Sequence, residues 1–329
     1  MPANPFTFGN PIRDPARFYG RVEDIRQIVN RLRSSAHEST SVVGERRIGK
    51  TSLLKHLDNP EVARGLGLSP NEYCIVYIDF QGLTDITQER FWGRVLQKIE
   101  RSICLPDLAP EVQQLRKQGD FDLFDLEDLF GKISDADFTT VLLLDEFEYV
   151  TQNPNFGSEF FGGLRALAIH HNLPLVTATR RELVDLCHSE ELRGSPFFNI
   201  FANLVLRPFS RQEVYGMLEG YMAHTGLLFS AREKELVIGL GGGHPFFTQI
   251  AGHYLYEAKE KELQDDFLLQ EVYENFDAQS DSHFTYMWSR SSESEKITLL
   301  VVISLGRQKL SKKTRPNLEN LAAIHPRAH

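Results

Sequence analysis

Short apolar runs alternate with longer amphipathic stretches over the first two thirds of the chain. The runs occupy residues 40–43, 73–79, 141–145, 175–179 and 200–206, and helix-like sequence follows each of the first four. Strands of this length that alternate with helices are typical of βαβ units, in which helices cover both faces of a parallel sheet. The pattern therefore predicts an α/β fold, a three-layer αβα domain with a five-stranded parallel sheet.

The flanking residues follow other patterns. Four prolines in the first 20 residues predict an extended lead-in, and apolar positions between Val22 and Leu32 form a helical stripe. After Pro208 the alternation stops, and four segments with helical character follow at 211–224, 231–240, 245–261 and 267–276. We therefore expect a lead-in over residues 1–20, the αβα domain over 21–207 and an all-helical domain over 208–280.

Two further segments need an interpretation. Spaced acids in residues 120–133 suggest a calcium loop, but Phe124 stands where such a loop needs a ligand. Its apolar positions, Phe124 among them, fit an amphipathic core helix better. Residues 280–295 are rich in Ser and Asp and are expected to form a linker, followed by an apolar run and a polar helix candidate.

Composition excludes several classes of protein. The formal net charge of −9 argues against a chain that attracts nucleic acid or anionic lipid over its whole surface, although a local basic patch can still do so. The three cysteines have no paired spacing, so reduced thiols are expected. There is no signal-like start, and the most apolar run, residues 297–305, is far short of the roughly 20 residues of a membrane span. We expect a cytoplasmic protein without membrane contacts.

The sequence GERRIGKT at residues 44–51 satisfies the pattern G-x-x-x-x-G-K-[ST] at every fixed position. Glycines allow consecutive backbone N–H groups to turn toward phosphates at a helix start. The lysine reaches the β- and γ-phosphates, and the threonine hydroxyl is a Mg²⁺ ligand. A plain glycine turn would not explain why Lys and Thr stand at these two positions. The predicted phosphate-binding residues are Gly44, Glu45, Arg46, Arg47, Ile48, Gly49, Lys50, Thr51 and Ser52.

An apolar strand ending in two acids complements this loop. Asp145 is expected to hold Mg²⁺, and Glu146 to orient or deprotonate the attacking water. A second acid here indicates an additional strand between the loop strand and the acidic strand, and residues 175–179 supply one. Arg180 follows that strand and is a candidate for neutralising the terminal phosphate; the alternative is a structural role for it and Arg181.

Two motifs leave their role open. The sequence GGGHP at residues 241–245 either ends one helix and starts the next, or brings Pro245 against a nucleotide base. Residues 18–21, which include Tyr19, Gly20 and Arg21, either wrap the base or dock the lead-in onto the domain.

Five segments together resemble the STAND group of AAA+-like ATPases: FYGRVEDI (18–25), GERRIGKTSLL (44–54), VLLLDEFE (141–148), TATRREL (177–183) and GGHPFFTQ (242–249). The resemblance implies that Arg180 is the arginine ending the sensor strand, that Pro245 contacts adenine, and that Gly20 and Arg21 line the base pocket. It covers roughly residues 5–280.

The resemblance also implies a function. Such proteins bind ATP or ADP with Mg²⁺, hydrolyse ATP slowly and act as switches in signalling or defence, often self-associating in the ATP state or engaging a protein partner. They usually continue into a full winged helix; here residues 281–329 leave room for the linker and a partial one. That segment and the basic tail after Arg307 keep an alternative open, a DNA-binding regulator or origin-type ATPase. A nucleotide-binding scaffold with hardly any turnover is a third interpretation.

Overall fold

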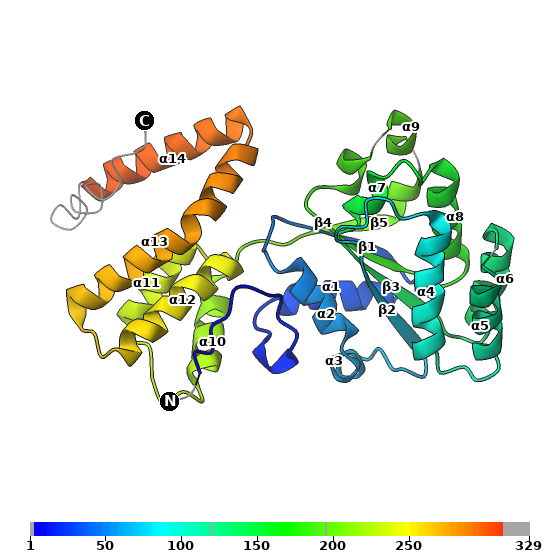
Figure 1. Ribbon diagram of the computed structural model, residues 1–329, viewed down its shortest axis with the longest axis horizontal. Helices are drawn as coiled ribbons and strands as arrows, with labels where there is room; N and C mark the ends of the chain where they lie inside the picture. Colours follow the sequence, from blue (N-terminus) through cyan, green and yellow to red (C-terminus); the bar gives the residue numbers. More distant parts are fainter. Residues whose placement is uncertain (1–2, 120, 188, 195, 312–329) are drawn as a thin grey trace. The chain divides into compact units, whose positions relative to one another are not determined.

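The computed structural model describes residues 3–119, 121–187, 189–194 and 196–311. The chain divides into two compact units between Val272 and Tyr273, and each is described by itself. Figure 1 labels the helices and strands along the chain. The first unit contains both the sheet and the helical domain that follows it.

Five parallel strands form one sheet in the first unit: β1 (Ser39–Val43), β2 (Tyr73–Asp79), β3 (Thr139–Asp145), β4 (Leu175–Thr179) and β5 (Phe201–Val205). Their order is β2-β3-β4-β1-β5. This confirms the predicted five-stranded parallel sheet. It also places β4 between the loop strand β1 and the acidic strand β3, as the two consecutive acids indicated. Val43 pairs with Thr179 and Asp145 with Ala178, so the carboxyl ends of β1, β3 and β4 meet at one edge.

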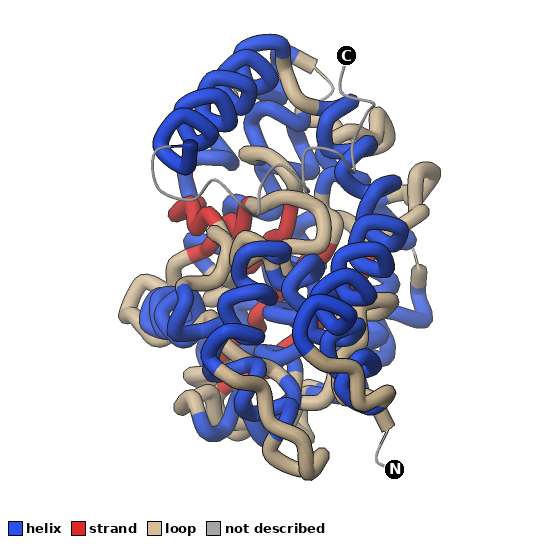
Figure 2. The backbone as a smooth tube through the Cα atoms, turned by 90° about the vertical axis from the view of Figure 1, so that its left-hand side faces the viewer, coloured by secondary structure: helices blue, strands red, loops and turns tan. Residues whose placement is uncertain are grey.

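Alternate residues of β3 enter the hydrophobic cores on opposite faces of the sheet. Leu142 and Leu144 face one core, and Val141 and Leu143 the other, because successive side chains of a strand point to opposite sides. The first core is covered by α4 (Gln88–Ser102), α5 (Ala109–Gln118), α6 (Leu123–Asp135), the short α7 (Glu148–Thr151) and α8 (Ser158–His170). The second is covered by α1 (Val22–Leu32), α2 (Lys50–Asp58) and α3 (Pro60–Gly65). Figure 2 shows the strands lying among these helices.

Helix α6 corrects one expectation. Asp122 forms a capping box with Asp125, so the helix begins at Leu123. Its apolar stripe at Leu126, Leu129, Phe130 and Ile133 faces the core and leaves Phe124, expected inside, 77% exposed. Helix α5 was not predicted, because only Val112 among its residues is fully buried.

Three helices that lie wholly in the first unit follow β5: α10 (Arg211–Met222), α11 (Ala231–Gly241) and α12 (Pro245–Glu260). Ser210 and Ser230 start the first two through capping boxes with Glu213 and Glu233. The lead-in is mostly extended, with one 3-10 turn at Pro15–Arg17. Its Phe6 is buried, with its ring 5.3 Å from that of Tyr221 in α10, so the lead-in is part of the helical domain's core.

The remaining short elements and the second unit complete the fold. Between β4 and β5 lie two 3-10 turns, Leu183–Leu186 and Pro196–Ile200, and the one-turn helix α9 (Glu190–Arg193). Helix α13 (Asp265–Arg290) crosses the unit boundary, and α14 (Glu293–Ser311) follows it.

The expected linker over residues 280–295 is therefore wrong for most of its length. The helix continues to Arg290, and Ser292 caps the next one by accepting from the N–H of Glu295. Ser and Asp have weak helix propensity, but such a preference is small and does not by itself end a helix. The proposed winged helix extends into residues 312–329, outside the described residues, and stays a prediction. In the described part of the chain, no helix combines the length and apolar character needed to cross a bilayer.

Candidate nucleotide-binding site

The loop between β1 and α2 has the backbone of an anion-binding turn. Arg47 and Gly49 have positive φ angles of 64° and 105°, which reverse the chain direction just before α2 starts at Lys50. The N–H groups of Gly49, Lys50 and Thr51 have no hydrogen-bond acceptor among the described residues. Unpaired N–H groups at the start of a helix suit a phosphate group, so the loop fits the ligand that its sequence predicts.

Lys50 lies under this loop and is buried. Its Nζ donates to the carbonyl oxygens of Gly44 at 2.7 Å and Glu45 at 3.1 Å. Burial lowers the pKa of Lys50, and nearby carboxylates, Glu146 foremost, oppose that shift. The ammonium group is thus held beside the loop amides and close to the acids that follow β3.

The two residues predicted to bind Mg²⁺ are in contact with each other. Asp145 is buried at the end of β3, and the hydroxyl of Thr51 forms a hydrogen bond with it. Tyr77 of β2 also donates its hydroxyl to Asp145 Oδ2 at 2.9 Å. Burial raises the pKa of Asp145, although both hydrogen bonds oppose the shift. Oxygen donors from two adjacent elements suit a hard divalent cation such as Mg²⁺.

Glu146 has a positive φ of 53°, uncommon for a residue with a side chain. Its side chain lines the nucleotide cavity, whereas its neighbour Asp145 points into the protein. Arg180, just after β4, places Nη2 3.7 Å from Glu146 Oε2 and Nε 3.3 Å from Glu148 Oε1. The predicted sensor arginine and the predicted catalytic acid therefore lie together, as the strand order requires.

Glu148 is a residue that the sequence analysis did not single out. It is buried in α7, and its carboxylate forms an ion pair with Arg180. Burial and the nearby Glu146 carboxylate raise the pKa of Glu148 to about 7. Glu148 is the third acid of the sequence VLLLDEFE, but the sequence does not indicate its burial beside Arg180, which depends on the one-turn helix after β3.

The nucleotide cavity has a volume of about 410 Å³. Phosphate-loop residues, Glu146 and Gln81 form one side, and the lead-in and α12 form the other. The lining residues are Thr7, Phe8, Gly9, Asn10, Pro11, Ile12, Arg46, Arg47, Gly49, Lys50, Thr51, Ser52, Gln81, Glu146, Pro245, Phe246 and Gln249. The cavity is therefore bounded by both domains of the first unit.

A smaller cavity of about 50 Å³ shares Ile12, Gly49, Ser52, Pro245 and Gln249 with the first. Tyr19, Arg21 and Ile48, three of the residues predicted at the nucleotide, line it. Gly20 does not line either cavity. A Cβ on Gly20, which has a φ of +72°, would lie 2.9 Å from the ring of Phe209, so this glycine permits close packing against the helical domain.

The lead-in, expected as a simple extension, closes one side of the site. Ile12 donates its N–H to Ser52 Oγ at 3.0 Å, and Arg47 Nη1 donates to the carbonyl oxygen of Phe8 at 3.0 Å. The same guanidinium lies 4.4 Å from the ring centre of Phe246 in α12. Residues 7–12 have no periodicity and no recognisable motif, so nothing in the sequence indicates that they line the site.

Arg21 joins the phosphate loop to the helical domain. Its Nη2 donates to the carbonyl oxygen of Ile48 at 2.8 Å and its Nη1 to that of Arg207 at 2.6 Å. Its backbone N–H donates to Glu213 Oε1 at 2.9 Å. Burial lowers the pKa of Arg21, while Asp24 and Glu213 favour its charged form. The Arg21 side chain therefore holds the phosphate loop against the segment after β5, and it also borders the smaller cavity.

A parallel sheet with a phosphate loop after β1, two acids at the carboxyl end of β3 and an intervening β4 defines the class of P-loop NTPases. A family model described as novel STAND NTPase 2 matches residues 25–306, and the chain belongs to that family. No curated protein matches the sequence.

Solved structures of P-loop ATPases have the same fold. The ORC2 protein of Aeropyrum pernix, solved with ADPNP and ADP, is 18% identical with a TM-score of 0.56, over 83% of this chain and 71% of its own. A Walker-type ATPase of Pyrococcus abyssi is 18% identical with a TM-score of 0.56, over 96% and 90% of the two chains. Domain III of the replication initiation protein DnaA from Thermotoga maritima is 13% identical with a TM-score of 0.50, over 81% and 98%.

Proposed function

We propose that this protein is an ATP-driven molecular switch of the STAND type, which binds Mg-ATP between its αβα and helical domains and hydrolyses it slowly. One observation carries the proposal. Lys50, Thr51 and Glu146 line the same cavity as Pro245 and Phe246 of the helical domain. The residues expected to act on the phosphates therefore lie beside the interface between the αβα and helical domains.

Each predicted residue has a role in this proposal. Backbone N–H groups around Gly49 and the Lys50 ammonium hold the phosphates. Thr51 and Asp145 hold Mg²⁺, which neutralises charge on the phosphate oxygens. Glu146 orients the attacking water and accepts its proton, and Arg180 stabilises the charge that develops on the terminal phosphate.

The switch follows from how the cavity is closed. Ile12, Phe8 and Phe246 contact the phosphate loop from the lead-in and α12. A nucleotide that displaces the Arg47 guanidinium from these partners weakens the closed arrangement, so binding energy is available to move the helical domain. ADP retention in the closed form, and self-association or a signalling partner in the ATP form, are the expected consequences.

Two variants test the proposal. Lys50→Ala is expected to weaken ATP binding by about tenfold or more, because the ammonium contact with the phosphates is lost. Glu146→Gln is expected to bind ATP while lowering turnover by about 10²-fold or more. Lys132→Ala, at an exposed position of α6 outside both cavities, is the matched control and should bind as the parent does. The proposal fails if Lys50→Ala and Glu146→Gln both behave like the parent.

A DNA-binding regulator has weaker support. The ORC1 protein of Aeropyrum pernix, solved in complex with DNA, has a TM-score of 0.50 at 16% identity, a likeness of fold alone. We expect no salt-sensitive duplex affinity. An affinity that falls with salt and disappears on removal of residues 296–329 would support DNA binding instead.

A further inference from the structure

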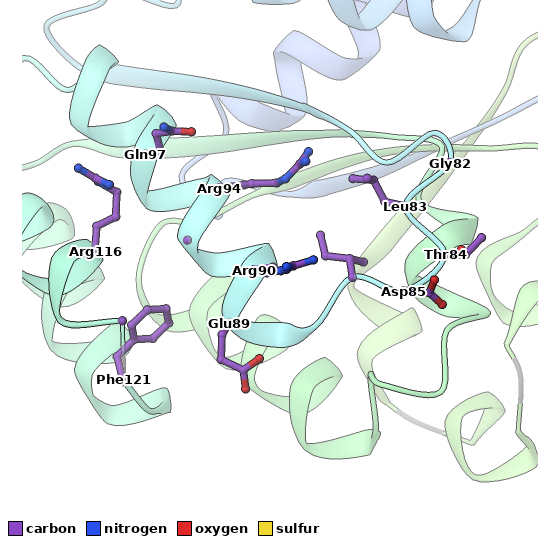
Figure 3. A pocket seen from close by; sticks show the side chains of 13 residues that line it. Gly82, Leu83, Thr84, Asp85, Glu89, Arg90, Arg94, Gln97, Arg116 and Phe121 are labelled. Atoms are coloured by element: carbon purple, nitrogen blue, oxygen red, sulfur yellow. The ribbon is translucent and has the colours of Figure 1, made fainter.

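A second hollow, of about 610 Å³, lies on the exposed face of α4 (Figure 3). The loop between β2 and α4 forms one wall, and the end of α5 with the residues that follow it forms the other. The lining residues are Gly82, Leu83, Thr84, Asp85, Ile86, Glu89, Arg90, Gly93, Arg94, Gln97, Arg116, Gly119 and Phe121. None of them lines the nucleotide cavity, although Gln81 of that cavity directly precedes Gly82.

Two arginines dominate the middle of this hollow. Arg90 and Arg94 are four residues apart on α4, and both are exposed. Figure 3 shows both side chains directed toward the loop that carries Leu83. Neither guanidinium has an ion-pair or hydrogen-bond partner in the described part of the chain. Like charges at this spacing destabilise a helix, so local helix stability does not account for the pair.

The glycine between the two arginines creates the space. Gly93 lies in the interior of α4, and a Cβ added to it would meet no atom within 4 Å. Glycine in a helix interior is less stable than alanine, and nothing in the packing requires it here. The arginine pair and Gly93 each lower the stability of α4. Both lie in the hollow, so a role there would explain both.

The acidic residues of the hollow are gathered at one end. Asp85 and Glu89 lie toward one end, while Gln97 and Arg116 lie toward the other, with Arg90 and Arg94 between them (Figure 3). Glu89 and Gln97 are about two helical turns, or roughly 12 Å, apart along α4. Arg116 is itself paired with Glu100 at 2.7 Å, so Arg90 and Arg94 are the cations available to a ligand.

We propose that this hollow binds a small phosphate monoester whose other end carries hydroxyl or amino donors. Arg90 and Arg94 offer planar forks that match phosphate oxygens, and Arg does this better than a point charge. Hydroxyl or amino groups would donate to Asp85 and Glu89, whereas a second anionic group there would be repelled. The volume is in the usual range for a small-molecule site of roughly 300–1,000 Å³.

The experiment titrates the full-length protein with ribose 5-phosphate, with MgADP present in excess so that the phosphate loop is occupied. The same titration is done on Lys50→Ala without ADP, where the phosphate loop is impaired. Binding that persists in this variant belongs to the hollow, whether or not the nucleotide proposal holds. Ribose, which lacks the phosphate, is expected not to bind. R90Q/R94Q and Gly93→Leu are each expected to weaken binding by about tenfold or more, the first by removing charge and the second by filling the hollow.

The matched control is K98Q/R101Q, which removes two charges from exposed residues of α4 outside the hollow. This variant should change the affinity for ribose 5-phosphate by less than about twofold, because solvent screens the charges of Lys98 and Arg101 from the ligand. The proposal is overturned if ribose 5-phosphate does not bind the parent, or if the control weakens binding as much as R90Q/R94Q does. Tighter binding of a single-stranded oligonucleotide without a terminal phosphate, lost in the same variants, would also overturn it.

Discussion

The guanidinium of Arg180 lies 3.3 Å from the buried carboxylate of Glu148. Arg180 also approaches Glu146, at 3.7 Å, so two acids share one arginine at the carboxyl ends of β3 and β4. Arg180 is 43% exposed and Glu148 is buried, so the interior acid fixes the position of the arginine at the site edge. Glu148 is thereby a positioning residue for the predicted sensor.

Glu148→Gln is expected to change how stability depends on pH. The folded-state pKa of Glu148 is raised from 4.5 to about 7, so between these values the folded protein binds more protons than the unfolded chain. The parent therefore loses stability as pH rises through this window, whereas glutamine, which stays neutral, does not. We expect Glu148→Gln to gain on the order of 1–3 kcal/mol relative to the parent between pH 5 and pH 8.

Urea unfolding of the nucleotide-free protein at pH 5, 6, 7 and 8 measures this difference. Glu38→Gln, at an exposed position outside α7 and the site, is the matched control for removal of one carboxylate. A constant difference for Glu148→Gln would mean that Glu148 is ionised throughout this range.

Tyr77→Phe tests how Asp145 is held. The variant keeps the ring, which Lys55 contacts at 4.0 Å, and removes only the hydroxyl that donates to Asp145 Oδ2. Loss of a hydrogen bond to a buried carboxylate is expected to cost about 1–3 kcal/mol of unfolding free energy. Because Asp145 is also the predicted Mg²⁺ ligand, the Mg²⁺ dependence of ATP affinity should shift. Tyr73→Phe, at the start of the same strand, should leave both quantities near the parent values.

Patterns that repeat along the chain predicted the sheet well. Alternating apolar runs indicated all five strands, and two consecutive acids after β3 indicated that β4 lies beside it. Helix phase was harder, because the buried stripe of α6 is Leu126, Leu129, Phe130 and Ile133, whereas the predicted apolar set included Phe121 and Phe124, before and at the start of the helix. The Ser- and Asp-rich residues of α13 continue the helix although residues 281–290 are mostly exposed, so composition alone is a weak guide to where a helix ends.

The site was predictable where one motif contains the chemistry. Lys50, Thr51, Asp145 and Glu146 come together because strand ends of a parallel sheet share an edge. Tyr77 and residues 7–12 were missed, since their contacts join segments that are separated in sequence and have no spacing pattern. Gly20 packs against Phe209 and Glu213 of the helical domain, and its predicted contact with the base stays a prediction.

Arg21→Lys probes the bridge between the phosphate loop and the helical domain. The guanidinium reaches the carbonyl oxygens of Ile48 and Arg207 with two separate nitrogens, which one ammonium group cannot do at the same distances. We expect a loss of about 1–3 kcal/mol in unfolding free energy and weaker nucleotide binding. Arg26→Lys, in an exposed pair with Glu23 on the same helix, should be close to neutral in chemical denaturation. If the two variants lower the unfolding free energy equally, Arg21 does not join the phosphate loop to the helical domain.

The adjacent glycines of the GGGHP motif offer a matched test of the connection between the two domains. Gly242 and Gly243 both have positive φ, 57° and 75°, so alanine at either position carries a left-handed backbone cost of about 1–2 kcal/mol. They differ in space. A Cβ on Gly242 meets nothing, whereas one on Gly243 would lie 2.3 Å from the carbonyl oxygen of Phe209.

Gly243→Ala must therefore displace the segment after β5, where Phe209 donates its N–H to the carbonyl oxygen of Gly243 at 2.7 Å. We expect it to destabilise the protein by roughly 1–3 kcal/mol more than Gly242→Ala does, because one buried contact is broken besides the shared backbone cost. Denaturant midpoints of the two variants, measured side by side, give this difference directly. If they coincide, the segment at Phe209 moves freely away from α12, and the helical domain is not held through this contact.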